Sequence, residues 1–214
     1  MSHLTPERLR SFPWIVSCDT LRLEDLLPRY WNAAETLELE LSAPLAAELQ
    51  RLVGVDSSYD DWSDDAAAEA VYALADLLDA AAPCGYYFGA SDGDGACFGF
   101  WLCDDWRDAL HERGIDCETP ENVAALLQEL DDHGVTAETL CDAYCGTADG
   151  WSPEAAGADY AQQLAGDLGV KLNQMQWPLT CIDWEAAWRE LEIGDGYSAI
   201  PAEGAGTFHI IRSI

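Results

Sequence analysis

The sequence predicts an α+β fold that is mainly helical, with a small aromatic antiparallel sheet and a C-terminal strand. Apolar residues recur at helical spacing over most of both halves, between Ser, Thr or Pro at the starts and Gly at the ends. The stretch 84–103 is instead rich in Tyr, Phe and Trp, and Asp92-Gly93-Asp94-Gly95 divides it in the way typical of a β-hairpin. The stretch Thr207–Arg212 predicts the closing strand.

Three helices are expected in the N-terminal part, over residues 20–41 with a bend at Pro28, over 44–53 and over 63–82. Ser63 suits the cap of the third helix. The apolar face of that helix is formed by four residues: Val71, Leu74, Leu77 and Leu78.

Five further helices are expected in the rest of the chain. Pro follows Thr119 and Ser152, and Pro suits the first helical position, so a helix begins at each of these two places. The expected ranges are 104–113, 119–133, 136–145, 152–168 and 183–193. The last of these helices carries an apolar face made by Trp184, Ala187, Trp188 and Leu191.

The chain of 214 residues is long enough for one large domain or for two to three small ones. Hydrophobic residues make up 49% of it, so it can bury a core, unlike a disordered acidic tail. We divide it into an N-terminal helical region (1–82), a small β-hairpin/α region (83–118) and an acidic helical and α+β region (119–214).

The net charge of −30 is the most unusual property of the sequence, with 40 Asp and Glu against 10 Lys and Arg. Two tracts, Leu52–Trp106 and Gly114–Val170, each hold twelve acidic residues and no basic residue, and Lys171 is the only lysine. Nucleic acids and anionic membranes are disfavoured as partners because both are polyanions. A basic surface is favoured, and the largest basic surfaces in a cell belong to proteins that grip nucleic-acid phosphates.

The carboxylates are therefore interpreted as a set that mimics the phosphates of DNA. Surface helices normally interleave Lys and Arg with acidic residues, and these tracts lack them. Two copies of the chain would carry −60, which is the charge of about 100 Å of duplex, or roughly 30 base pairs. The candidate partner-binding carboxylates are Asp60, Asp61, Asp64, Asp65, Asp104, Asp105, Glu129, Asp131, Asp132, Glu138, Asp142 and Asp149.

No cofactor and no metal are expected. A calcium loop at Asp92–Gly95 would need oxygen ligands where Ala96 and Cys103 stand. Cys141 and Cys145 would share a helix face, but zinc needs two more ligands, and the four histidines are scattered. The eight cysteines include no CxxC pair, so we expect reduced thiols that pack as small apolar residues.

An enzyme is not the expected class. The chain has no Gly-rich phosphate loop and no G-x-S-x-G elbow, and paired carboxylates are too plentiful to indicate an acid–base site. Two alternatives remain open beside an enzyme with an unrecognised site. The chain could be an acidic adaptor of a halophile, or an inhibitor of another DNA-binding defence protein. A low-salt source would exclude the halophile.

A cytoplasmic location is expected. The N-terminal residues do not combine a basic start, an apolar run and a small-residue cleavage site. No stretch approaches the roughly 18–20 apolar residues of a membrane span.

The C-terminal part resembles a known family over about residues 120–214. The segments that carry the resemblance are Leu140-Cys-Asp-Ala-Tyr144-Cys-Gly146, Tyr160-Ala-Gln-Gln-Leu164-Ala, Cys181-Ile-Asp183-Trp184-Glu185-Ala-Ala-Trp188-Arg189-Glu-Leu191, Tyr197 and Phe208-His-Ile-Ile-Arg212. In this order they are similar to the C-terminal half of the ArdA antirestriction family. Residues 1 to about 80 do not align with that family.

This resemblance implies an elongated homodimer that mimics bent B-form DNA. It also implies a partner, a type I restriction–modification complex, which the dimer inhibits by occupying the DNA groove. Neither nucleic acid nor a membrane is an expected partner.

Overall fold

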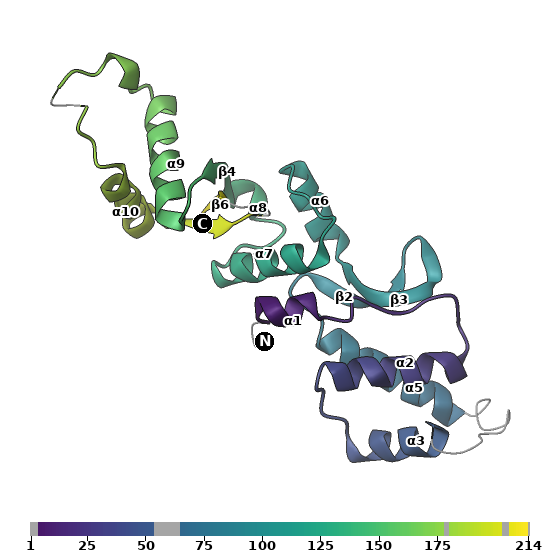
Figure 1. Cartoon of the computed structure of the whole chain (residues 1–214). Helices are drawn as coiled ribbons and strands as arrows, with labels where there is room; N and C mark the ends of the chain where they lie inside the picture. The colour runs from purple at the N-terminus through teal and green to yellow at the C-terminus, as the bar shows by residue number, and fades with distance from the viewer. Residues whose placement is uncertain (1–3, 54–64, 178–179, 203–205, 214) are drawn as a thin grey trace. The chain divides into compact units, whose positions relative to one another are not determined.

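A computed structural model describes residues 4–53, 65–177, 180–202 and 206–213 (Figure 1). These residues form nine α-helices and two three-stranded antiparallel sheets, so the expected α+β fold with its C-terminal strand is confirmed. The chain divides into two compact units, Met1–Asp104 and Asp105–Ile214. The hairpin that we assigned to a region of its own (83–118) thus belongs to the same unit as the N-terminal helices.

The sheet of the first unit contains the predicted hairpin. Strand β2 (Tyr86–Ser91) pairs with β3 (Asp94–Leu102), and Asp92-Gly93 form the turn. A third strand, β1 (Ile15–Ser17), pairs with the other edge of β3 and was not predicted. Gly99 permits this pairing, because a Cβ there would lie 2.3 Å from the Trp14 carbonyl oxygen.

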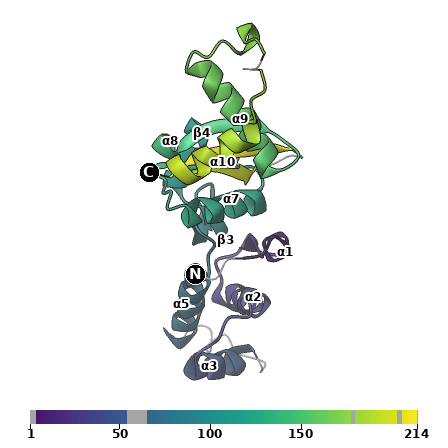
Figure 2. The same cartoon turned by 90° about the vertical axis from the view of Figure 1, so that its left-hand side faces the viewer.

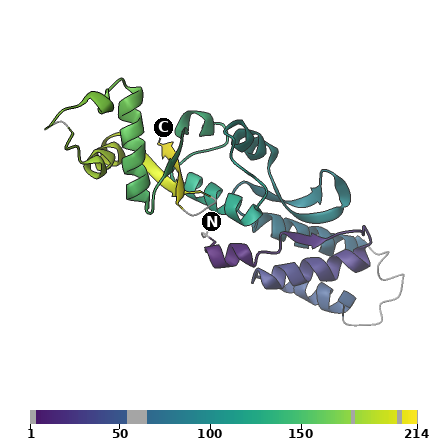
Figure 3. The same cartoon turned by 45° about the horizontal axis from the view of Figure 1, so that its top comes forward.

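Four helices accompany this sheet: α1 (Pro6–Arg10), α2 (Leu23–Thr36), α3 (Ala43–Val53) and α5 (Asp65–Ala80). The three longer ones were predicted, although α2 ends five residues early, with Glu38 just beyond it at a positive φ of 57°. Helix α5 packs against both α2 and α3 (Figure 3). Their shared core includes the fully buried Leu27, Leu49, Leu74 and Leu78.

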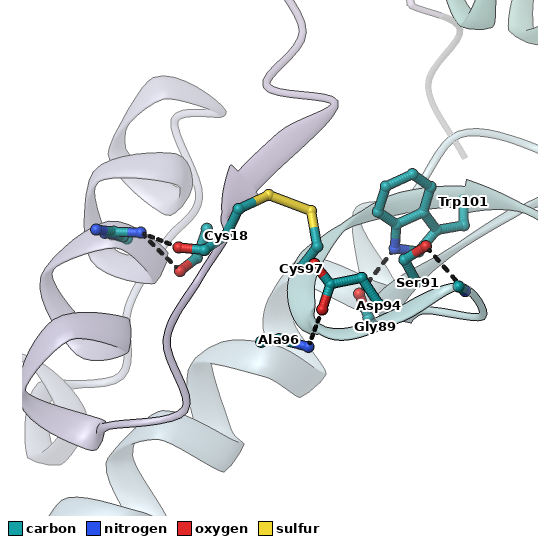
Figure 4. The surroundings of a disulfide bond; sticks show 10 residues. Cys18, Gly89, Ser91, Asp94, Ala96, Cys97 and Trp101 are labelled. Carbon is teal, nitrogen blue, oxygen red and sulfur yellow. Dashed lines mark hydrogen bonds between the residues drawn. A yellow bond between two sulfur atoms is a disulfide. The ribbon is translucent and has the colours of Figure 1, made fainter.

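The expectation of reduced cysteines is wrong for one pair. Cys18, which follows β1, forms a disulfide with Cys97 of β3 (Figure 4). Because Ser17 lies opposite Phe98 in the antiparallel register, the next residues on each side, Cys18 and Cys97, face each other. They are 79 residues apart in sequence, so only the unpredicted pairing of β1 brings them together. The other six cysteines form no disulfide in the described residues.

The described helices of the second unit are α6 (Asp104–Glu112), whose first residue ends the first unit, α7 (Pro120–Asp132), α8 (Leu140–Ala143), α9 (Pro153–Asp167), the 3-10 helix η1 (Leu172–Gln174) and α10 (Trp184–Asp195). The starts predicted at 119, 152 and 183 are confirmed. The Ser152 hydroxyl accepts from the Ala155 N–H, and the Asp183 carboxylate from the Ala186 N–H. These bonds satisfy N–H groups that a helix start leaves without a partner.

The predicted helix over 136–145 is confirmed at residues 140–143 and wrong on both sides of them. Only α8 is helical there, and Tyr144–Asp149 form strand β4. Strand β4 pairs with β6 (Thr207–Arg212), which pairs in turn with β5 (Tyr197–Pro201). Cys145 therefore lies in a strand and does not share a helix face with Cys141. Pairing with the distant strand β6 outweighs the local helical pattern.

Trp188 is the largest fully buried side chain of the second unit. It lies on α10, which packs against α9 (Figure 2). A Cβ added at Gly157 of α9 would lie 2.1 Å from the Trp188 ring, so this glycine makes room for the indole. The cluster around it includes Ala156, Phe208 and Ile210.

We expect Gly157→Ala to lower the free energy of unfolding. Ala in place of a helical Gly normally gains up to about 1 kcal/mol. Here overpacking against Trp188 costs about 1–3 kcal/mol, so the loss outweighs the gain. The matched control is Gly166→Ala on the same helix, where nothing lies within 4 Å of the added Cβ. Urea unfolding of both variants tests this, and a stable Gly157→Ala with a weakened Gly166→Ala would contradict it.

Candidate partner-binding surface

None of the described carboxylates is buried. All are exposed except Asp25, Glu48, Glu121 and Asp159, which are half-buried. An ionised group is costly to bury. A chain with this net charge can therefore form a hydrophobic core only if its carboxylates stay in water. The charge of the described carboxylates is therefore presented to solvent.

Three of the five arginines of the first unit pair with carboxylates, whereas Arg29 donates to the Ser17 hydroxyl and to the Cys18 carbonyl. Arg8 pairs with Glu38 at 2.8 Å, and Arg22 pairs with Glu24 at 3.4 Å. Arg51 pairs with Glu48 at 2.6 Å and lowers the pKa of that carboxyl group through a hydrogen bond. Part of the negative charge of this unit is thus compensated locally.

Three basic residues of the second unit contact a carbonyl oxygen or an aromatic ring. Arg113 donates a hydrogen bond to the Cys141 carbonyl, and Arg189 donates one to the Glu185 carbonyl at 3.3 Å. The Arg212 guanidinium lies 5.9 Å from the centre of the Tyr197 ring. This unit holds 21 Asp and Glu against five Lys and Arg. Three of those five cations contact carbonyl oxygens or a ring.

Helix α6 carries the densest group of carboxylates on a single described helix. Asp104, Asp108 and Glu112 follow one another at intervals of four residues, and Asp105 lies next to them. We call these four residues the α6 acidic row. All four are exposed, whereas Trp106, Ala109 and Leu110 of the same helix are buried. The hydrophobic side of α6 is thus used for packing, and its acidic side is left in solvent.

The charge density of this row is close to that of a nucleic-acid strand. At 1.5 Å per residue, the nine residues of α6 span roughly 13.5 Å. Four carboxylates over that length give one negative charge per about 3.4 Å, the spacing of charges along one strand of duplex DNA, and the exposed Arg107 of the same helix offsets one of them. Like charges at i and i+4 cost about 0.2–0.5 kcal/mol per pair, which applies to Asp108 with Asp104 and with Glu112, whereas a carboxylate in the first turn of a helix is favoured by the helix dipole.

A second group lies at the end of α7, where Glu129, Asp131 and Asp132 are exposed. Carboxylates at a helix C-terminus oppose the helix dipole, which costs stability as well. Glu138 is exposed, and so is Asp142 of α8. Asp149, at the end of β4, is exposed and accepts a hydrogen bond from the Thr207 hydroxyl at 3.0 Å.

The structure locates nine of the twelve predicted carboxylates, all of them exposed. Asp60, Asp61 and Asp64 fall outside the described residues, while Asp65 is the first residue of α5. Helical spacing brings Asp104 and Asp105 together with two carboxylates that our prediction omitted, Asp108 and Glu112. The interval of four residues from Asp104 is the sequence signal that would have found both.

Other chemistry finds little support in the described residues. Among them, no group of three or more His, Cys, Asp or Glu could hold a metal ion. Burial raises the pKa of the Cys117 and Cys145 thiols, and this disfavours the thiolate that a nucleophilic cysteine requires. In the part of the chain that the structure describes, no helix has the length and apolar character needed to span a membrane.

Comparison with family models, with curated proteins and with solved structures found no match to this chain.

Repulsion among the surface charges should make thermal stability depend on salt. We expect the Tm to rise between about 0.05 and 0.5 M NaCl, because added ions shorten the range of the repulsion. For a chain of this size, each kcal/mol of relief corresponds to about 2–4 °C. Differential scanning calorimetry at neutral pH measures the shift. A Tm that falls on adding salt would mean that attractive ion pairs dominate.

Proposed function

We propose that this protein is a DNA mimic that inhibits a restriction–modification enzyme by occupying its DNA-binding groove. The observation that carries the proposal is the α6 acidic row, with its exposed carboxylates at the charge spacing of a DNA strand. Glu112, Asp131 and Asp132 lie at helix C-terminal ends, where a carboxylate opposes the helix dipole, and a basic partner supplies a reason for them outside folding. The inhibitor acts by binding and catalyses no reaction.

The resemblance to the ArdA family directs the proposal to type I restriction enzymes. The residues that carry it lie in the second unit, where three of the cations contact carbonyl oxygens or a ring. A mimic would occupy the DNA groove of such an enzyme in place of the duplex.

The cytoplasm is the place where such an inhibitor would meet its target. Disulfides are rare there, so the Cys18–Cys97 pair would be reduced in that compartment. Strand β1 does not depend on the disulfide alone, because the Phe100 N–H donates to the Trp14 carbonyl at 2.8 Å. Reduction is therefore compatible with the fold of the first unit.

The direct test is a DNA-cleavage assay with a purified type I restriction enzyme and rising amounts of the protein. Inhibition should be complete near a stoichiometric ratio, and excess DNA lacking recognition sites should relieve it by competing for the same groove. Inhibition that persists at any DNA concentration would exclude the shared groove. If the protein displaces only other DNA-binding proteins from DNA, then the assignment to type I enzymes is wrong, but the protein still acts as a DNA mimic.

A further inference from the structure

Cys18 and Cys97 lie where a small thiol can reach them. Both residues are half-buried, and the disulfide that joins them links the end of β1 to β3 (Figure 4). Exchange with a dissolved thiol requires access to one of the two sulfur atoms, and partial exposure provides it. Disulfides are rare in the cytoplasm, and those that form there are mostly catalytic or redox-sensing. The pair is therefore a candidate for reversible oxidation.

Strand β1 is short and lies at an edge of its sheet. It contains three residues, and its register against β3 shifts between Ile15 and Ser17. Asp19 has a φ of 68°, a left-handed conformation that does not continue a strand. A strand of this length has few backbone hydrogen bonds with which to stay on the sheet. The disulfide adds a covalent constraint to its position.

Noncovalent contacts keep Cys18 near Cys97 when the disulfide is broken. Arg29 of α2 donates to the Ser17 hydroxyl at 3.0 Å and to the Cys18 carbonyl at 3.1 Å. The Trp14 carbonyl accepts from an N–H of β3 at 2.8 Å. Two thiols that are held close together have a high effective concentration for each other, so the disulfide can form again after reduction.

We propose that Cys18 and Cys97 are a reversible redox pair, which fastens β1 to the sheet under oxidising conditions and loosens it under reducing ones. The oxidant is a small disulfide such as glutathione disulfide. One cysteine thiolate attacks it, which forms a mixed disulfide and releases one glutathione thiolate. The other cysteine thiolate attacks the mixed disulfide and releases the second. The two glutathione thiolates take up the two protons that the cysteines lose, so one glutathione disulfide is reduced for each pair oxidised.

Oxidation should stabilise the first unit. The two cysteines are 79 residues apart, and α2, α3, α5 and β2 lie between them. A cross-link that closes a loop of this length restricts the unfolded chain, and it lowers the equilibrium constant for unfolding by roughly 10²–10³-fold. The pair thus regulates the stability of the first unit. The proposal does not depend on the identity of the inhibited enzyme.

Titration of the full-length protein with glutathione tests the reversibility. The protein is equilibrated at ratios of glutathione to glutathione disulfide from about 1:1 to 1000:1, and its thiols are then blocked with a maleimide for intact-mass analysis. The wild type should have six thiols at the oxidising end and eight at the reducing end, whichever end it starts from. Peptide mapping should assign the change to Cys18 and Cys97. A count that stays at six or at eight at every ratio would overturn the proposal.

Thermal unfolding and hydrogen exchange measure the effect on the fold. Reduction should lower the Tm of the first unit by about 5–15 °C. The Phe100 amide, which donates to the Trp14 carbonyl, should exchange roughly tenfold faster or more in the reduced protein, because β1 is then held less firmly. Equal Tm values and equal exchange in the two redox states would show that the disulfide does not control β1.

A double variant, Cys18→Ser with Cys97→Ser, removes the pair. It should keep six thiols at every ratio and have the Tm of the reduced wild type throughout. The matched control is Cys181→Ser, which removes an exposed thiol of the second unit, and its Tm should respond to glutathione as the wild type does. A double variant whose Tm still rises under oxidising conditions would assign the effect to other cysteines, and so would a control that no longer responds.

Discussion

Binding to the restriction enzyme is expected to weaken by at least two orders of magnitude when NaCl rises from about 50 to 200 mM. Proteins that make six to ten phosphate contacts lose roughly 10³–10⁵ in affinity for DNA over this range, through release of the DNA's counterions. A protein surface condenses fewer ions than a duplex, so we expect a smaller but still steep loss. Titration calorimetry at four salt concentrations gives the slope of log Kd against log [NaCl].

The control for this experiment is a DNA duplex of about 30 base pairs with the same enzyme, whose slope sets the upper limit. A Kd for the acidic protein that does not change with salt would contradict mimicry. A Kd that improves with salt would favour the halophilic adaptor, since apolar contacts strengthen when charge repulsion is screened.

Much of the fold could be predicted from local signals in the sequence. Helices α7, α9 and α10 each begin directly after a capping residue that can be recognised in the sequence. The Asp92-Gly93 turn is likewise a local signal for the hairpin. The strands that prediction missed, β1, β4 and β5, are short, and β1 and β4 are held by partners distant in sequence. The Cys18–Cys97 disulfide was missed for the same reason, because it follows from the position of β1.

The candidate surface was predictable in kind but not in arrangement. Net charge and the scarcity of Lys and Arg indicated an acidic surface, which requires no knowledge of the fold. Placing Asp108 and Glu112 with Asp104 and Asp105 requires the bounds of α6 and the knowledge of its buried side. The contact of Arg212 with the Tyr197 ring depends on the pairing of β5 with β6 and left no signal in the sequence.

Neutralising the whole α6 acidic row should weaken inhibition by roughly 100-fold or more, whereas each single substitution should weaken it about fivefold at most. Exposed ion pairs contribute up to about 1 kcal/mol each, so four of them add to several kcal/mol. The variant combines Asp104→Asn, Asp105→Asn, Asp108→Asn and Glu112→Gln. Its fold should survive because the four side chains are exposed. The Asp105 carboxylate accepts from the Trp106 N–H, and the amide that replaces it keeps an oxygen for this bond.

The matched control removes four exposed carboxylates from the first unit, by Glu7→Gln, Glu24→Gln, Glu35→Gln and Glu40→Gln, and so changes the net charge equally. Inhibition of DNA cleavage is measured at rising concentrations of each variant. If the control is impaired as strongly as the row variant, then total charge rather than the row binds the enzyme.

A quadruple row variant that still inhibits fully would show that another face binds the enzyme, and the exposed carboxylates Asp131, Asp132, Glu138 and Asp142 would be the next set to replace. A single substitution that abolishes inhibition in a folded protein would instead point to one essential carboxylate, as expected of an enzyme, for which such a loss costs orders of magnitude in rate.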